Sequence, residues 1–199
     1  MKIYKRLLLF ASIIFILAGT LLISLSLSDL NHSEAETENA LTEAKEKVRD
    51  KEGGTILRKN AIIQYEKGEV IGILEIPGLE AELPIIEGTH EDELEKGVGH
   101  YAGSVFPGQE DQIVLSGHRD TVFRRLGELE IGDTLQIVMP YGKYSYKISQ
   151  SQIVEANDTS IIQSTAPVET LIVSTCYPFS FIGDAPYRYV LTAYREESK

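Results

Sequence analysis

Residues 61–199 predict an all-β domain, either a sandwich or a barrel. The first observation is a series of eight short segments that are apolar or alternate between apolar and polar residues, and the second is the turn-forming residues that separate them. The third is the scarcity of helical periodicity, which leaves too few helices for repeated β-α-β units. The length of this part suits one domain that can bury about two-thirds of its unfolded surface.

The predicted strands have the apolar or alternating composition of buried and half-buried β-structure. They are residues 70–76, 82–87, 113–116, 134–139, 143–148, 151–155, 170–176 and 188–194. Pro84 restricts the second segment to an edge or to a strand start, because proline has no amide hydrogen. Residues 90–96 are expected to form a short acidic helix, and residues 121–126 one helical turn.

Residues 1–28 predict a cytoplasmic tip followed by a transmembrane anchor. Three basic residues lie within the first six positions, and the 22 residues from 7 to 28 carry no charge. A helix of that length spans roughly 33 Å, enough to cross a hydrocarbon core of about 30 Å. Basic residues before the span and acidic residues after it place the rest of the chain outside the cytoplasm.

A cleaved signal peptide is the alternative for this segment. Its apolar region is usually about 7–15 residues long, which is shorter than the uncharged stretch here. Ser24-Leu25-Ser26 offers only a weak cleavage site. The length therefore favours an uncleaved anchor.

Residues 29–60 are expected to form a connector. Residues 34–52 are rich in glutamate, alanine and lysine, which are good helix formers, and Gly53-Gly54 ends this stretch. Its apolar stripe is thin and consists of Leu41, Ala44 and Val48. We expect a solvated helix or a partly ordered stalk rather than an element packed on the following domain.

The charge of the chain argues against a nucleic-acid partner. Without the three basic residues of segment 1–28, 16 basic residues face 30 acidic ones, for a net charge of −14. Nucleic-acid binding relies on Lys and Arg to neutralise phosphates, and so acidic a domain does not fit it.

Cys176 is the single cysteine, and it ends the apolar run 171–176. One cysteine in an exported protein forms no internal disulfide, so it is a buried inert thiol, a link to another chain or a reactive group. Its place at a strand end favours the reactive group. A catalytic cysteine needs a nearby base or cation, since at an ordinary pKa of about 8.5 little of the thiol is ionised at pH 7.

His118 is the histidine best placed to serve Cys176. It ends the apolar run 113–118, and its imidazole can give or take a proton near neutral pH. A strand-end histidine bonded to backbone is the alternative. The remaining histidines are expected in the connector or in solvated surface positions: His32, His90 and His100.

Arg188 begins the strand that follows Cys176. If strands 170–176 and 188–194 pair antiparallel, Cys176 and Arg188 project at the same rim of the sheet. There the guanidinium could hold the oxyanion of a tetrahedral intermediate or fix the substrate backbone. An edge arginine paired with Asp184 is the alternative. The weaker candidates lie in turns, a polar helix or the tail: Arg119, Arg124, Arg125 and Arg195.

The loop between these two strands carries four aromatic residues and two prolines within residues 177–187. Such a loop either walls an apolar binding groove or covers one end of the barrel.

These residues resemble the sortases, the membrane-bound cysteine transpeptidases of Gram-positive bacteria. The resemblance covers roughly residues 69–194 and includes 72–77 and 83–85, which are similar to the first strands of the family. The motifs that carry it are Leu115-Ser116-Gly117-His118-Arg119-Asp120, Val173-Ser174-Thr175-Cys176-Tyr177-Pro178 and Arg188-Tyr189-Val190. The Cys-Tyr-Pro-Phe sequence, the anchor and the short C-terminal end are most similar to class D. The family's Thr-Leu-x-Thr-Cys reads here as residues 172–176, with Thr and Leu replaced by Ile and Val.

The resemblance implies an eight-stranded β-barrel with short helices and a two-step acyl transfer. Cys176 would attack the Thr–Gly or Thr–Ala bond of a Leu-Pro-x-Thr signal, and His118 would protonate the leaving amine. Arg188 would stabilise the oxyanion, and Thr175 would add a hydrogen bond to the oxyanion or to the substrate.

The resemblance also implies the partners and the location. The substrates would be secreted proteins that carry the sorting signal, and the acceptor would be an amine of the peptidoglycan precursor. The catalytic domain would lie outside the cell, tethered to the membrane by its N-terminal helix. No cofactor is expected; some sortases bind calcium, but acidic residues alone predict no site here.

Two other functions remain open from the sequence. A thiol hydrolase would use water as the acceptor in place of an amine. A non-catalytic anchored barrel would bind peptide or cell-wall glycan, and its Cys176 would be buried and unreactive.

Overall fold

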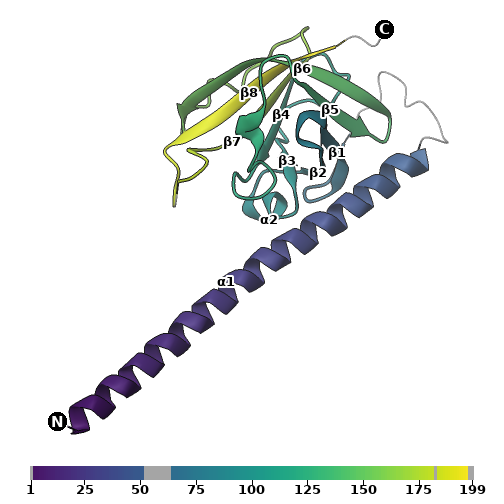
Figure 1. Cartoon of the computed structure of the whole chain (residues 1–199). Coiled ribbons are helices and arrows are strands. Elements are labelled where there is room, and N and C mark those ends of the chain that lie inside the picture. Colours follow the sequence, from purple (N-terminus) through teal and green to yellow (C-terminus); the bar gives the residue numbers. More distant parts are fainter. Residues whose placement is uncertain (1, 52–63, 182, 197–199) are drawn as a thin grey trace. The chain divides into compact units, whose positions relative to one another are not determined.

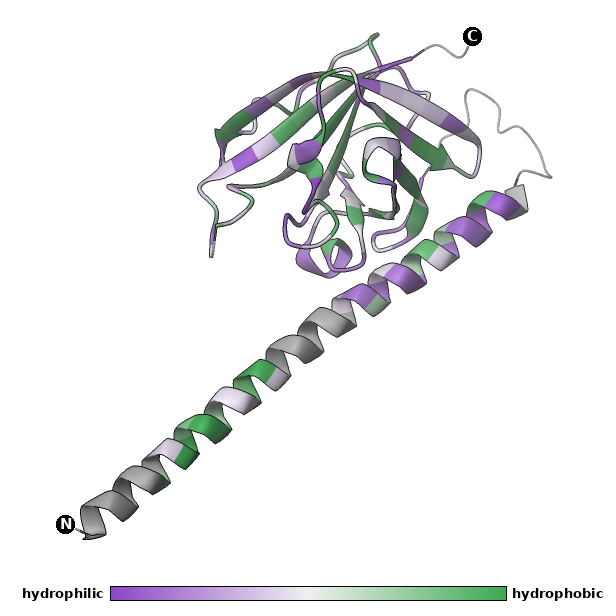
Figure 2. Ribbon diagram, viewed as in Figure 1, coloured by the Kyte–Doolittle hydropathy of each residue, from purple (hydrophilic) through white to green (hydrophobic). Residues whose placement is uncertain are grey.

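The computed structural model describes residues 2–51, 64–181 and 183–196. It divides the chain into two compact units, residues 1–36 and residues 37–199. Helix α1 (Lys2–Lys51) begins in the first unit and ends in the second. Figure 2 shows hydrophobic residues along the described part of α1 in the first unit. The large apolar side chains described there are exposed; they are Phe10, Ile13, Ile14, Phe15, Ile16, Leu17, Leu21, Leu22 and Ile23.

Within the part of the chain that the structure describes, no helix is both long enough and apolar enough to cross a membrane. Met1 and the side chains of residues 2–9, 11 and 25–32 lie outside the described residues. The anchor expected at residues 1–28 is therefore not confirmed and stays a prediction.

The second unit is built around a closed eight-stranded barrel in the order β1-β2-β3-β4-β7-β8-β6-β5 (Figure 1). Its strands are β1 (Val70–Ile76), β2 (Ala81–Glu87), β3 (Val98–His100), β4 (Gln112–Gly117), β5 (Thr134–Met139), β6 (Gly142–Glu155), β7 (Thr170–Tyr177) and β8 (Tyr187–Arg195). The short helices are η1 (Pro77–Leu79), α2 (Glu91–Leu94) and η2 (Leu126–Glu128). The predicted all-β barrel with short helices is confirmed.

Two of the eight strands differ from the predicted set. β3 is a strand of three residues where the sequence indicated a loop, and it pairs with β2 and β4. The segments 143–148 and 151–155 form one strand, β6. The polar residues between them lie at a bulge in the β6–β8 ladder rather than in a turn, because the register shifts between Ile148 and Gln150.

The predicted strand limits hold closely elsewhere. Pro84 lies within β2 opposite Ile73 of β1, and the β2–β3 pairing begins one residue later at Ile85. The missing amide hydrogen of proline therefore falls where β2 has no second neighbour. α2 lies within the predicted 90–96 helix, and the predicted helical turn at 121–126 is a series of turns that leads into η2.

The barrel has an apolar interior and a smaller apolar cluster on its outer face. Residues that alternate along the strands, such as Leu115, Val173 and Leu191, are buried in the interior. On the opposite face of the same strands, three buried side chains form the smaller cluster, with Val154 and Ile161 packed against it; they are Val114, Ile172 and Val190. This second face is relevant to the site because it carries Cys176.

The last turns of α1 pack on the barrel, contrary to the expected solvated stalk. Ala40 and Ala44 are buried against side chains of β1 and β2, namely Val70, Ile73 and Ile86. Lys47 donates a hydrogen bond from Nζ to the carbonyl of Val70 at 2.9 Å. A thin stripe is enough because alanine lets the helix approach the strands closely. Residues 52–60 of the connector, with Gly53-Gly54, lie outside the described residues.

Candidate active site

Strand register places the three predicted catalytic residues in one row. β4 and β7 are parallel with Gly117 opposite Thr175, so His118 follows β4 beside Cys176. β7 and β8 are antiparallel with Cys176 opposite Arg188, as the sequence predicted. Three neighbouring strands therefore bring the thiol, the imidazole and the guanidinium to one end of the barrel.

Cys176 points away from the barrel interior. Along β7 it alternates with Thr175 and shares its face with Ile172 of the outer apolar cluster. It is partly exposed and has no disulfide partner. The thiol is thus within reach of a substrate, which argues against the buried inert cysteine.

Thr175 faces the opposite way and is buried. Its hydroxyl donates a hydrogen bond to the carbonyl of Gly117 at 2.7 Å. This bond ties β7 to β4 one residue before Cys176 and His118. The geometry favours a positioning role for Thr175 over the expected contact with oxyanion or substrate.

Arg188 is half-buried and bonded to its own loop. Nη1 donates to the carbonyl oxygens of Ala185 at 3.2 Å and Tyr187 at 3.0 Å. In the described part of the chain its partners are thus backbone carbonyls and not the carboxylate of Asp184, the alternative that the sequence left open. The guanidinium has five N–H donors, so these two bonds do not exhaust it.

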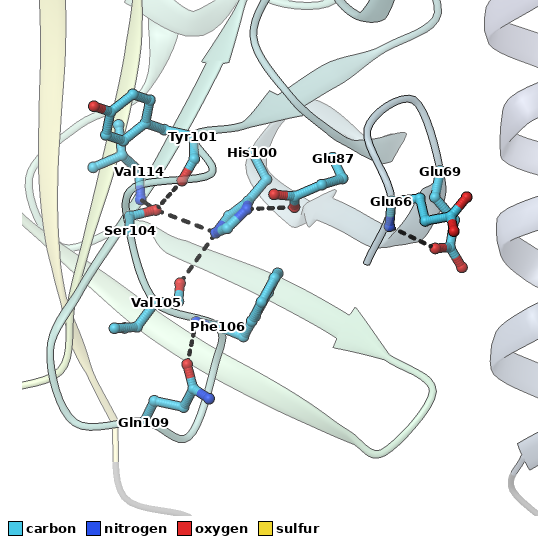
Figure 3. Close-up of polar contacts among 10 residues, drawn as sticks. All are labelled: Glu66, Glu69, Glu87, His100, Tyr101, Ser104, Val105, Phe106, Gln109 and Val114. Carbon is cyan, nitrogen blue, oxygen red and sulfur yellow. Dashed lines mark hydrogen bonds and ion pairs between the residues drawn. The ribbon is translucent and has the colours of Figure 1, made fainter. Parts of the chain in front are cut away.

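His100 is buried, which corrects the expected solvated position (Figure 3). Its side chain lies between Glu87 Oε2, 2.7 Å from Nδ1, and the carbonyl of Val105, 3.1 Å from Nε2. Ser104 Oγ lies 3.2 Å from Nε2, and the ring of Phe106 stacks on the imidazole at 4.5 Å between centroids. The sequence missed it because its partners come from β2 and from the loop after β3.

The Glu87, His100 and Ser104 group has the order of a hydrolase triad but a structural role. The Ser104 hydroxyl donates to the carbonyl of Tyr101 at 2.8 Å and accepts the amide hydrogen of Val114 at 3.1 Å. The bond with Val114 ties the loop to β4 and the bond with Tyr101 closes a turn within the loop, so the hydroxyl is not available as a nucleophile. His90, by contrast, is exposed at the start of α2 as expected, while the side chain of His32 lies outside the described residues.

The loop after Cys176 contributes aromatic side chains to a cavity of about 400 Å³. Tyr177, Phe179 and Tyr189 contact one another edge-on or stacked, with ring centroids 5.3 to 6.3 Å apart. These rings line the cavity together with Arg124, Arg125, Gly127, Glu128 and Ile153. Phe179 and Tyr189 also pack against the interior core, so the loop both walls a cavity and covers this end of the barrel.

Arg119 is buried, although the sequence ranked it among the weaker arginines. It donates from Nη1 to the carbonyl of Pro178 at 3.2 Å and from Nη2 to the carbonyl of Gly183 at 3.0 Å. The one sequence feature that could have indicated a place near the site is that Arg119 directly follows His118. Arg124 and Arg125 are exposed, and Arg195 lies over the ring of Tyr144 at 4.4 Å.

No group of three or more His, Cys, Asp or Glu side chains among the described residues is arranged to hold a metal ion. The expectation of a cofactor-free site stays untested, and the chemistry derived below uses side chains alone.

Comparison with known proteins identifies the fold and the family. The family described as "Sortase domain" matches residues 74–196, more than half of the chain. Sortase D of Bacillus subtilis (strain 168) is 49% identical over 189 residues, which cover 89% of this chain and 94% of the relative.

Solved structures share the barrel. A sortase D5 transpeptidase of Clostridium perfringens superimposes with a TM-score of 0.68 at 23% identity, covering 82% of this chain and 99% of that one. Sortase C1 of Streptococcus suis gives a TM-score of 0.62 at 28% identity, covering 66% and 75%.

The family match and the shared barrel identify a cysteine transpeptidase. The chain belongs to the sortase family, whose members attach surface proteins to the cell wall of Gram-positive bacteria. The expected similarity to class D is confirmed by its relative, Sortase D.

Proposed function

We propose that this chain cleaves a Leu-Pro-x-Thr sorting signal and transfers the acyl group to an amine of the peptidoglycan precursor. The observation that carries the proposal is the row of His118, Cys176 and Arg188 on adjacent strands, with the thiol partly exposed. Family membership supports the same reaction class.

The reaction has two balanced steps. Cys176 Sγ bonds to the threonine carbonyl carbon, the Thr–Gly or Thr–Ala C–N bond breaks, and His118 gives its proton to the leaving amine. The acceptor amine then attacks the thioester, His118 takes its proton, and the C–S bond breaks to return the thiolate. Arg188 balances the oxyanion of each tetrahedral intermediate.

The outer face of β4, β7 and β8 supplies a surface for an extended substrate beside Cys176. Ser116 and Ser174 lie opposite each other and share that face with His118 and Cys176, one alternate position away. Both hydroxyls are half-buried, and the apolar cluster of Val114, Ile172 and Val190 lies behind them. Farther from the thiol the same face is closed, because these three side chains are at most 4% exposed and Val154 and Ile161 pack against them. The floor that is open to a peptide is therefore the polar part near Ser116, Ser174 and Cys176.

The loop between β6 and β7 lies against this surface. The Gln112 side chain donates to the carbonyl of Ile161 at 2.9 Å and accepts from the amide of Gln163 at 3.0 Å. The loop is thereby fixed on the same strand that carries His118, and Ile161 packs on the apolar cluster.

The proposal includes a single-pass membrane anchor with the catalytic domain outside the cell. Its support is the uncharged segment 7–28, the basic residues before it and the exposed apolar side chains between Phe10 and Ile23. Secreted substrates and a lipid-linked acceptor both pass along the outer membrane surface. A tethered enzyme therefore meets them at a raised effective concentration.

The test is a peptide assay with the full-length chain and its Cys176→Ala variant. Peptides with Leu-Pro-x-Thr followed by Gly or Ala are supplied with and without an amine acceptor, and mass spectrometry follows the products. We expect a ligated product from the parent chain and none from Cys176→Ala. Cleavage without ligation at saturating amine would favour the thiol hydrolase, and undiminished turnover by Cys176→Ala would exclude both enzymes.

A further inference from the structure

We propose that Arg119 is a positioning residue of the active site, which clamps the loop that joins Cys176 to Arg188. The inference rests on the proposed function and extends it to a residue outside the catalytic row. One guanidinium binds the carbonyls of Pro178 and Gly183, five residues apart on that loop.

The base of the clamp is fixed to the barrel. Arg119 follows His118, whose carbonyl accepts the amide hydrogen of Phe123 at 3.0 Å. Phe123 is buried in the interior core, and a side-chain atom added at Gly117 would lie 2.7 Å from its ring. The backbone that carries His118 and Arg119 is therefore held by packing on both sides.

The loop that Arg119 binds joins Cys176 to Arg188, so its conformation sets the distance between the nucleophile and the guanidinium of Arg188. Pro178 lies two residues after Cys176, and its carbonyl also accepts the amide hydrogen of Phe181 at 3.2 Å. Arg188 holds the end of the same loop through Ala185 and Tyr187. The loop thus presents four carbonyls to two guanidinium groups, one beside His118 and one in the catalytic row.

The burial of Arg119 is difficult to explain by stability alone. The side chain is 7% exposed, and among the described residues its Nε makes no hydrogen bond. Its other contacts are weak: an ion pair between Nε and the exposed carboxylate of Asp120 at 3.5 Å, and the ring of Phe181, whose centroid lies 5.9 Å away. A buried, incompletely paired cation is costly to retain. The planar fork of arginine donates to the two carbonyls from two different nitrogens, a fixed geometry that the single ammonium group of lysine does not reproduce, so the geometry points to a requirement for that fork.

The test uses the full-length chain with Arg119→Lys and Arg119→Gln, and Arg49→Gln as a control. Arg49 is an exposed arginine of α1 with no part in the site. Four properties are measured: kcat and KM of transfer, the pH profile of Cys176 alkylation by iodoacetamide, proteolysis of residues 178–186, and unfolding by urea.

We expect both Arg119 variants to lose roughly tenfold or more in kcat, with a smaller change in KM, because misplaced catalytic groups slow the chemical step more than binding on an intact floor. The alkylation profile shifts and the loop is cleaved faster, while Arg49→Gln matches the parent. Loss of cooperative unfolding in both variants would overturn the proposal, because a positioning residue leaves the fold intact.

Alkylation and proteolysis need no substrate, so they separate this inference from the proposed function. If the parent chain transfers no acyl group, the proposed function fails, and the two substrate-free measurements still decide whether Arg119 holds the loop. Unchanged alkylation, unchanged cleavage and kcat within twofold of the parent would remove Arg119 from any positioning role.

Discussion

Cys176, His118 and Arg188 depend on one another because each alone is weakly suited to acyl transfer. A thiol at its ordinary pKa is mostly protonated at pH 7, and an amine is a poor leaving group until it accepts a proton. In the sequence, His118 and Cys176 are 58 positions apart, and Cys176 and Arg188 are 12 positions apart. The strand register brings all three side chains to neighbouring positions.

His118→Gln is expected to lower kcat by about 10²-fold or more, because glutamine keeps a polar side chain but transfers no proton. The measurement is steady-state transfer with the peptide and the amine acceptor. Cys176 should remain open to slow alkylation, which shows that the thiol is still present and accessible. A kcat within a fewfold of the parent would rule out His118 as the acid and base.

Thr175→Val is expected to reduce the free energy of unfolding by about 1–3 kcal/mol, because the buried carbonyl of Gly117 loses its donor. Urea denaturation measures this change. Thr175→Ser keeps the hydroxyl and serves as the matched control, with a smaller loss. Equal stability of the two variants would show that the hydrogen bond contributes nothing.

Single residues could be predicted from the sequence where strand ends marked them. Cys176, His118 and Arg188 each end or begin an apolar run, and the predicted antiparallel pairing places Cys176 opposite Arg188. The parallel pairing of β4 with β7, which brings His118 beside Cys176, was not predicted. The burial of His100 and of Arg119 was not predicted, because their hydrogen-bond partners, Glu87 and the loop carbonyls, lie on other elements. Local pattern carries no information on such long-range hydrogen bonds.

At the scale of elements, periodicity predicted the long strands and failed at the short and bent ones. β5 matches its predicted limits, since six residues show a clear alternation. β3 has three residues, too few for any period, and β6 carries a bulge whose polar residues resembled a turn. The apolar stripe of α1 was recognised, but its packing on the barrel was not expected, because so few apolar side chains indicated a solvated helix.

Asp111 makes the loop of residues 156–169 dependent on pH. The amide hydrogen of Thr165 and then that of Gln112 hold the pKa of its carboxyl below the ordinary value of 3.8. Because the pKa of Asp111 is lowered, the ionised carboxylate stabilises the folded loop fully above pH 3.8. This stabilisation is lost as the pH falls through the pKa that Asp111 has in the folded protein. We expect Asp111→Asn to loosen the loop at pH 7, measured as faster proteolysis within residues 156–169.

The same variant supplies its own control in acid. As pH falls through the folded pKa of Asp111, the parent loses the carboxylate charge that Asp111→Asn removes at every pH. The difference in loop protection between the parent and the variant should therefore narrow in acid. A difference that widens in acid, or none at pH 7, would contradict the assignment. Asp158 is a second carboxylate of this loop and accepts the amide hydrogen of Ser160. Asp158→Asn therefore tests whether the loss of any charge from the loop has the same effect.

At the scale of the whole molecule, residues 37–51 of α1 belong to the same compact unit as the barrel. They cover an apolar patch of β1 and β2 that a shortened chain would expose to water. A soluble form that begins near residue 55 would therefore lose part of the fold.

Ala44→Glu is expected to reduce the free energy of unfolding by about 2 kcal/mol or more, because it places a charge against Val70, Ile73 and Ile86. Thr42→Glu puts the same side chain on the exposed face of the helix and is expected to change stability little. Both are measured by thermal or urea unfolding. Similar stability in the two variants would mean that the packing of this part of α1 on the barrel does not contribute to the free energy of unfolding.

The register that aligns the row also limits how such an enzyme can change over evolutionary time. Inserting one amino acid upstream of Cys176 within its strand would rotate every later side chain to the opposite face and send the sulfur into the core. Lengthening the loop at residues 156–169 leaves that alignment intact. We therefore expect length changes to be tolerated in this loop, and single-residue insertions in β7 or β8 to abolish catalysis unless a bulge like that of β6 absorbs them.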